Sequence, residues 1–358
     1  MQYFKGFDTL RVICSLVIIW SHMEILKSEN AIPSMSRDLP FYPGGHIRVI
    51  FFLVLSSFLI TYLLTGEKEK NGDINLRKFY IKRILRIWPL YYFIILLCYF
   101  LFGPDPNNIT TILCLFMLPN VAYAFDINFL YSPQIWFIGA SEQFYLLFPI
   151  LFSVIPERRI ILWLFLFYIG YTLFPHLLVR IYSNEQFGKT VFKIYYATQF
   201  NSMAMGCIAG YAFRKNLKWI GILKKNVFAF GSIILAVILW GLNFEEKYFN
   251  DEIFSTLFAI IIIGVAGNKN IKIGSKISTF LGKISYGIYL YHWIVMLIAL
   301  KYIKYNENDN IIYYNFVLYS FVISSTIIVS WISHITIERY FLQLKTRIGT
   351  YINIIGKI

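Results

Sequence analysis

The chain has 358 residues, of which 58% are hydrophobic and 15% are charged, against about 25% charged in a typical soluble domain. This composition excludes a water-soluble globular fold. The 33 Lys and Arg residues outnumber the 19 Asp and Glu residues. In so apolar a chain we interpret that excess by its position along a membrane, and we expect no nucleic-acid partner.

Apolar segments of membrane-spanning length follow one another along the chain. A bilayer span takes about 20 residues, so ten spans would use about 200 and leave only short loops. We therefore expect an all-α integral membrane protein whose chemistry lies within or between its helices. The eleven candidate segments are 8–26, 46–65, 84–102, 109–125, 135–155, 160–179, 194–213, 226–242, 252–267, 284–300 and 311–336.

The loops between these segments differ in charge. Loops 66–83 and 214–225 are rich in Lys and Arg, which indicates the cytoplasmic side, whereas loop 103–108 has no cation. The two basic loops share a side only if an even number of spans separates them, yet five candidates lie between them. The short segment 109–125 is interrupted by Pro119-Asn120, so we assign it as a re-entrant or interfacial helix.

This assignment leaves about ten transmembrane helices with both termini in the cytoplasm. We expect one transmembrane domain over residues 1–340, a cytoplasmic tail over 341–358 and no soluble domain. The four cysteines lie inside apolar runs, without the paired spacing of a zinc site, so we interpret them as packing residues and expect no metal.

The first span carries two ionisable residues, Arg11 and His22. Eleven residues make three helical turns and about 16 Å, so both side chains lie on one helix face. Ionisable groups within a span need a partner or a function. Taken singly, Arg11 could reach the lipid headgroups and His22 could cap the helix, but their shared face favours a functional pair.

The third span begins with the cations Lys82, Arg83 and Arg86, followed by an aromatic cluster that contains Tyr91. Planar guanidinium groups suit phosphates, such as those of a nucleotide-bearing acyl donor. The structural alternative is an ordinary positively charged anchor with an aromatic belt.

Segment 135–155 contains Glu142 with no cation nearby in the sequence. In the ten-span topology Glu142 lies at the depth of His22, so we expect the two to form a general base and its orienting partner. His292 lies near the middle of its span among tyrosines, and a buried core histidine is the more typical interpretation there.

Together these segments resemble the acyltransferase family 3 of integral-membrane O-acyltransferases, from Phe7 to about Glu338. The resemblance implies ten membrane helices and transfer of an acyl group, usually acetyl from cytoplasmic acetyl-CoA, to a hydroxyl of a glycan or another acceptor. We expect that acceptor to be a cell-envelope or secreted glycan. The stretches that carry the resemblance are Gly6–Arg11 with His22, Phe51–Ile60, Arg83 and Arg86 with Pro89–Tyr92, Trp136–Tyr145, and Ser285–His292.

The resemblance also implies roles for individual residues. Arg11 and His22 match the essential pair of the family, and the basic pair that helps to hold CoA, usually Arg-Arg, is Lys82-Arg83 here. One carboxylate, Glu142, remains where relatives have two. The candidate sites are thus His22, Glu142 and Arg11 for catalysis; Lys82, Arg83, Arg86 and Tyr91 for acetyl-CoA; and His46, Trp136 and His292 for the acceptor.

Two other functions remain open at this point. Intramembrane Arg, His and Glu residues could form the proton relay of a transporter for a polar solute or a lipid-linked glycan. The chain could also be a scaffold subunit of a polysaccharide-synthesis complex. Within the acyltransferase hypothesis, His22 either activates the acceptor hydroxyl directly or carries the acyl group itself. The expected location is the bacterial inner membrane, with membrane lipid, acyl-CoA and the acceptor as partners.

Overall fold

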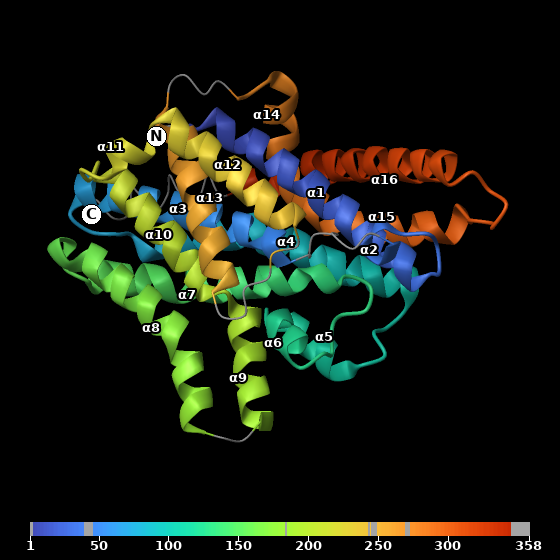
Figure 1. The fold of residues 1–358 in the computed structure, drawn as a ribbon, viewed down its shortest axis with the longest axis horizontal. Coiled ribbons are helices and arrows are strands. Elements are labelled where there is room, and N and C mark those ends of the chain that lie inside the picture. The colour runs from blue at the N-terminus through green and yellow to red at the C-terminus, as the bar shows by residue number, and fades with distance from the viewer. Residues whose placement is uncertain are drawn as a thin grey trace.

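The computed structural model describes residues 3–38, 46–182, 185–242, 244, 249–268 and 273–344, and these form helices and connecting loops only (Figure 1). The helices are α1 (Lys5–Glu29), α2 (Met35–Asp38), α3 (His46–Asn71), α4 (Leu76–Phe102), α5 (Asn108–Leu115), α6 (Pro119–Ala124), α7 (Trp136–Val154), α8 (Ile160–Ile181), α9 (Glu185–Thr198), α10 (Phe200–Arg214), α11 (Ile220–Leu223), α12 (Asn226–Gly241), α13 (Asn250–Gly267), α14 (Lys276–Lys283), α15 (Ser285–Tyr302) and α16 (Ile311–Ser333), with 3₁₀ turns at Pro133–Ile135 and Glu157–Arg159 and a π-helical segment at His334–Glu338.

Seven of the described helical segments are long and apolar enough to cross a membrane. An eighth is obtained if α14 and α15, which meet at 68°, count as one bent span. The expected all-helical integral membrane protein is confirmed, whereas the count of ten spans and the cytoplasmic termini stay predictions. The seven segments are Lys5–Glu29, Val49–Asn71, Leu76–Phe102, Pro133–Val154, Glu157–Ile181, Asn250–Gly267 and Ile311–Leu344.

Two expected spans are shorter in the structure than in the prediction. Segment 194–213 is divided between α9 and α10 at Gln199, whose φ of 54° ends the first helix. Segment 226–242 becomes the 16-residue α12. Segment 109–125 forms two helices of eight and six residues, α5 and α6, and each is far too short for a hydrocarbon layer of about 30 Å.

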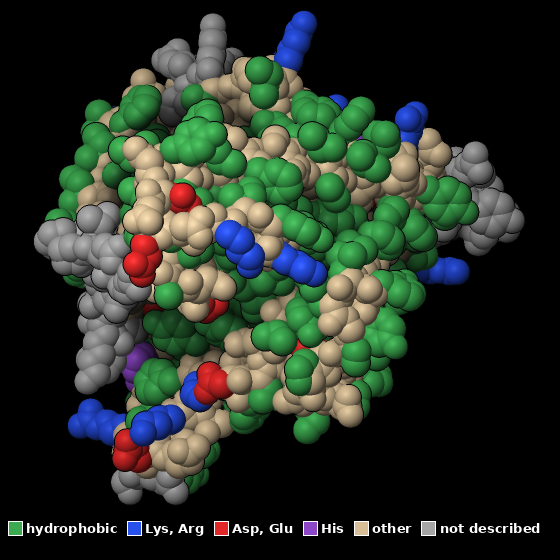
Figure 2. All heavy atoms as spheres, turned by 90° about the vertical axis from the view of Figure 1, so that its right-hand side faces the viewer, with side chains coloured by type: hydrophobic (Ala, Val, Ile, Leu, Met, Phe, Trp, Pro, Cys, Tyr) green, Lys and Arg blue, Asp and Glu red, His purple; other side chains and the backbone are tan. Residues whose placement is uncertain are grey.

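The molecular surface matches a lipid environment. Figure 2 shows one face of the molecule, on which hydrophobic side chains predominate and Lys and Arg residues are few. Large apolar side chains such as Leu146, Val154 and Val227 project outward from α7 and α12. Soluble proteins rarely expose so continuous an apolar surface.

Helix α3 lies at the centre of the bundle, and α10 packs closely against it. Gly206 and Gly210 of α10 form a Gly-x-x-x-Gly motif that faces Val54, Ser57 and Phe58 of α3. A Cβ atom at Gly206 would lie 2.0 Å from the Ser57 Oγ and 2.4 Å from the Val54 carbonyl oxygen, and one at Gly210 would lie 2.4 Å from the Phe58 carbonyl oxygen. Small residues at this spacing let two membrane helices approach with their backbones in contact.

We therefore expect Gly206→Ala to destabilise the protein by about 1–3 kcal/mol, because overpacking forces α3 and α10 apart. Thermal unfolding of the detergent-solubilised protein measures the effect. Gly231→Ala in α12 is the matched control, since nothing lies within 4 Å of a Cβ atom built there. If Gly206→Ala unfolds at the temperature of the unsubstituted protein, the close contact between α3 and α10 is not a source of stability.

Candidate active site

His22 of α1 lies against His292 of α15. The His22 Nδ1 and the His292 Nε2 are 2.8 Å apart, the ring centroids are 5.1 Å apart, and the two ring planes are 12° from parallel. The rings of Trp293 and His22 meet edge to face, with centroids 5.2 Å apart. The other ring nitrogen of His292, Nδ1, lies 3.2 Å from the Ile288 carbonyl oxygen, and the His292 side chain is fully buried.

Arg11, in the second turn of α1, is bound by Asp8. The Arg11 Nη1 donates to the Asp8 Oδ1 at 2.9 Å, and the Asp8 carboxylate also accepts from the Tyr3 hydroxyl. A Cβ atom at Gly282 would lie 2.5 Å from the Asp8 Cβ, so the closeness of α14 fixes this end of α1. The Arg11 side chain is 22% exposed and retains four further N–H donors. Arg11 and His22 therefore stand on one unbroken helix, as the sequence predicts.

Glu142 does not form the expected pair with His22. Both Glu142 oxygens bind donors from α4, namely the Arg83 Nε at 2.8 Å and the Trp88 Nε1 at 3.2 Å. The Arg83 guanidinium lies 3.6 Å above the ring of Tyr145, one helical turn after Glu142. The pairing was wrong because α4 packs beside α7 at this depth, and a largely buried carboxylate binds the cation that the neighbouring helix presents.

The three cations at the start of α4 differ in their contacts. Arg83 is bound to Glu142, but Lys82 and Arg86 make no hydrogen bond or ion pair within the part of the chain that the structure describes. The two lie four residues apart, hence on one helix face. The Arg86 side chain is exposed, and it lies within electrostatic range of Arg11, Arg83 and Glu338. An anionic ligand is the partner that such unpaired cations accept.

The other candidate residues are placed as follows. Tyr91 is fully buried and donates its hydroxyl to the Cys114 carbonyl oxygen at 2.8 Å, so a cofactor could touch it only after α5 moved. Trp136 is 8% exposed and stacks on Tyr123 with ring centroids 4.7 Å apart. The side chain of His46, at the start of α3, lies outside the described residues.

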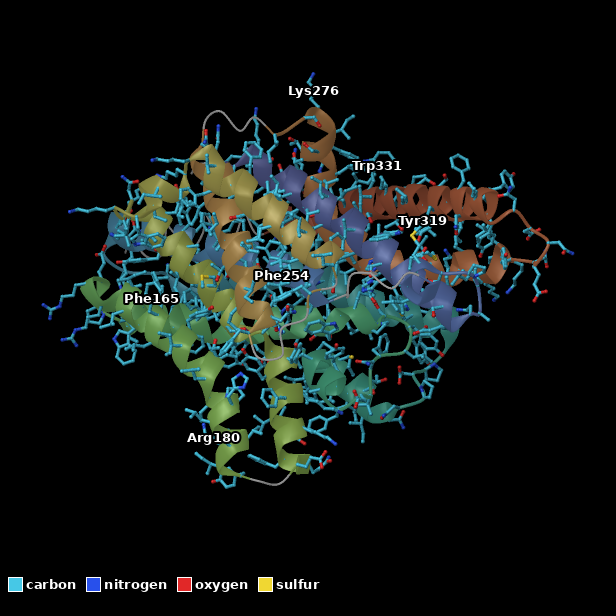
Figure 3. The ribbon with its side chains drawn as sticks, viewed as in Figure 1. Phe165, Arg180, Phe254, Lys276, Tyr319 and Trp331 are labelled. Carbon is cyan, nitrogen blue, oxygen red and sulfur yellow. The ribbon has the colours of Figure 1, made fainter. Side chains whose placement is uncertain are left out.

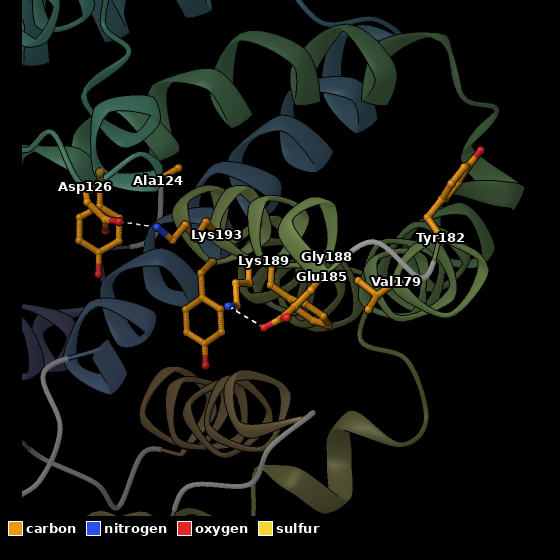
Figure 4. Close-up of a pocket in the computed structure, with 11 residues that line it drawn as sticks. Ala124, Asp126, Val179, Tyr182, Glu185, Gly188, Lys189 and Lys193 are labelled. Atoms are coloured by element: carbon orange, nitrogen blue, oxygen red, sulfur yellow. Dashed lines mark hydrogen bonds and ion pairs between the residues drawn. The ribbon is translucent and has the colours of Figure 1, made fainter.

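A cavity of 830 Å³ lies between α6, α8 and α9 (Figure 4). Ion pairs join Lys189 to Glu185 and Lys193 to Asp126 along its wall, and none of the candidate site residues lines it. Tyr123 connects the cavity to a candidate site residue, because it lines the cavity and its ring stacks on that of Trp136. No sequence pattern indicates this cavity, because its walls come from three separate segments.

Asp8 and Trp88 are the site residues that sequence reasoning missed. Asp8 lies three residues before Arg11, a spacing at which helical side chains pair, so that contact could have been predicted. Trp88 contacts Glu142 across 54 positions of sequence, and no local pattern indicates it. Among the described residues, no three His, Cys, Asp or Glu side chains form a group that could hold a metal ion.

Comparison with known proteins identifies the family. A family described as "Acyltransferase domain" matches residues 4–335. A putative O-acetyltransferase of Staphylococcus aureus strain COL is 27% identical over 335 residues, covering 84% of this chain and 52% of the relative. The O-acetyltransferase OatA of S. aureus strain NCTC 8325 is 24% identical over 333 residues with the same coverage.

The chain thus spans about half the length of the curated relatives it matches. No solved structure matches it. Since the family match covers nearly the whole described chain, including both histidines of the α1–α15 contact, the protein belongs to acyltransferase family 3.

Proposed function

We propose that the protein is a membrane O-acetyltransferase that moves an acetyl group from acetyl-CoA to a hydroxyl of a cell-envelope glycan. The observation that carries this proposal is the pairing of His22 with His292 at 2.8 Å on the helix that also bears Arg11. A membrane-embedded histidine with a fixed ring supplies a base at neutral pH. The relatives named O-acetyltransferases support acetyl as the transferred group.

Lys82 and Arg86 are proposed to hold the phosphates of the donor. Both are unpaired in the described structure, they share a face of α4, and Arg86 lies in the positive field of Arg11 and Arg83. Arg83 has a different role in the proposal, because its Nε is bound to Glu142 and its guanidinium lies on Tyr145.

His22 is the proposed reactive side chain. In direct transfer, a ring nitrogen removes the proton of the acceptor hydroxyl while its oxygen bonds to the acyl carbon and the carbon–sulfur bond breaks. The imidazolium then returns that proton to the leaving thiolate, so the products are an ester and a free thiol. Trp136 and the aromatic cavity behind Tyr123 are proposed to contact the acceptor, since aromatic rings stack on sugar rings.

The proposed setting is the inner membrane of a bacterium. The bacterial origin of the relatives and the apolar helices of this chain support it. A donor made in the cytoplasm would reach Lys82 and Arg86 from the side on which the basic loops lie. The acceptor would then meet His22 from the opposite side.

Replacing Lys82 or Arg86 by Ala is expected to raise the KM for acetyl-CoA by about 10-fold each, with little change in kcat, because a charge-assisted phosphate contact is lost. Steady-state kinetics of thiol release by the reconstituted protein measure this. Acetyl-pantetheine, which lacks the nucleotide, should be used equally by the variants and the unsubstituted protein.

Lys276→Ala is the matched control for loss of a cation. Figure 3 shows Lys276 projecting away from the bundle at the start of α14, and its removal should leave the KM unchanged. If Lys276→Ala raises the KM as much as Arg86→Ala does, the cations of α4 do not form a specific phosphate site.

A further inference from the structure

The hydrogen bonds around His292 determine which of its nitrogens carries the proton. A carbonyl oxygen can only accept, so the His292 Nδ1 that faces the Ile288 oxygen at 3.2 Å must be the N–H group. His292 is fully buried and no carboxylate pairs with it in the described structure. A buried imidazolium without a counter-ion is strongly disfavoured. The ring is therefore neutral, and its Nε2 is an acceptor.

The same reasoning extends to the protonated nitrogen of His22. The His292 Nε2 accepts a hydrogen bond from the His22 Nδ1 at 2.8 Å, so the His22 Nδ1 carries a proton. In the neutral form of His22 the lone pair is then on Nε2, the nitrogen on the far side of the ring. The edge-to-face contact between Trp293 and His22 limits rotation of the His22 ring away from this arrangement.

We propose that His292 is a positioning residue that holds His22 in the Nδ1–H tautomer, so that the Nε2 of His22 is the atom that removes the acceptor proton. This proposal rests on the proposed function of His22. It replaces the expectation that His292 binds the acceptor, since a fully buried side chain presents no surface to one. When Nε2 gains the proton, the positive charge on His22 shortens and strengthens the Nδ1–H bond to His292. Both direct transfer and an acyl-histidine route use the same nitrogen.

The tautomer itself can be measured without any turnover. The chain contains five histidines, and the ¹⁵N chemical shifts of their ring nitrogens distinguish Nδ1–H from Nε2–H in the protein labelled only at histidine. The ring ¹⁵N signals that disappear in His22→Gln and in His292→Gln are those of His22 and His292, respectively. We expect Nδ1–H for both residues near neutral pH. An Nε2–H form of His22 in the unsubstituted protein would overturn the proposal.

Two substitutions of His292 separate positioning from packing. In His292→Gln the side-chain oxygen lies where Nε2 was and can still accept from His22, whereas the shorter amide of His292→Asn mimics Nδ1 and does not reach. We expect His292→Gln to keep kcat within about 10-fold and His292→Asn to lower it by about 100-fold, with the KM for acetyl-CoA unchanged in both. Equal losses in both variants, or a rise in the acceptor KM instead of a fall in kcat, would contradict the proposal.

These measurements keep the two claims apart. If the unsubstituted protein transfers no acetyl group, the proposed function fails while the ¹⁵N shifts still decide the tautomer. If transfer depends on His22 but the shifts show Nε2–H, only the role of His292 fails. Thermal unfolding of each variant identifies any loss of activity that comes from misfolding.

Discussion

His22→Ala is expected to lower acetyl transfer by at least about 1000-fold while the protein remains in the membrane. In the proposed mechanism His22 supplies the nitrogen that takes the acceptor proton, and removal of a general base from a positioned site costs about 100- to 10,000-fold in rate. Its half-buried ring contacts those of His292 and Trp293, and we expect the helices to stay assembled without it. Transfer of label from acetyl-CoA to the acceptor, normalised to protein in the membrane fraction, measures the effect.

His176→Ala provides the control for loss of a membrane-embedded histidine. His176 lies in α8, where its ring packs between Phe192 and Phe249 at 5.2 and 5.8 Å. We expect this variant to retain activity within a few-fold. Full activity of His22→Ala, or an equal loss in both variants, would remove His22 from the mechanism.

Glu142→Leu is expected to destabilise the protein by about 3–5 kcal/mol, because it leaves the largely buried Arg83 without its counter-ion. The double variant Arg83→Met with Glu142→Leu should recover much of that loss, since two apolar side chains can replace a buried ion pair. Unfolding of the solubilised protein by heat or denaturant measures the change in the free energy of unfolding for the single and the double variant. Activity of the double variant then tests whether Glu142 has any role beyond binding Arg83.

The ion pair of Glu69 with Arg214 and Lys215 is the control for an exposed contact. These side chains are 22–34% exposed, and Glu69→Gln should cost less than about 1 kcal/mol. If Glu142→Leu is as mild as Glu69→Gln, the Arg83–Glu142 pair contributes little to the fold.

The sequence predicted those features that depend on local hydropathy and helical spacing. Composition predicts the helical membrane class, and residue spacing predicts that Arg11 and His22 lie on one helix. The position of a proline predicts that segment 109–125 does not form a full span. The break at Gln199 was missed, because its left-handed conformation carries no strong sequence signal in a residue other than glycine.

The contacts that define the site could not be predicted, because they join distant segments. His22 meets His292 across 270 positions, and Arg83 meets Glu142 across 59. A rotation of α4 or α15 by a fraction of a turn would change these partners without any change in hydropathy. Even the buried pair of Glu24 and Lys27 within α1, at 2.8 Å, is completed by the Tyr319 hydroxyl of distant α16 (Figure 3).

The central claim is that the protein transfers an acyl group through His22, and one reconstitution tests it most directly. The purified protein in lipid vesicles receives acetyl-CoA labelled in the acetyl group together with envelope glycans as acceptor. We expect label to become ester-linked to the glycan with release of one thiol per acetyl group, and we expect none of this with His22→Ala. Movement of glycan across the vesicle membrane without label or thiol release would instead identify a carrier and contradict the account.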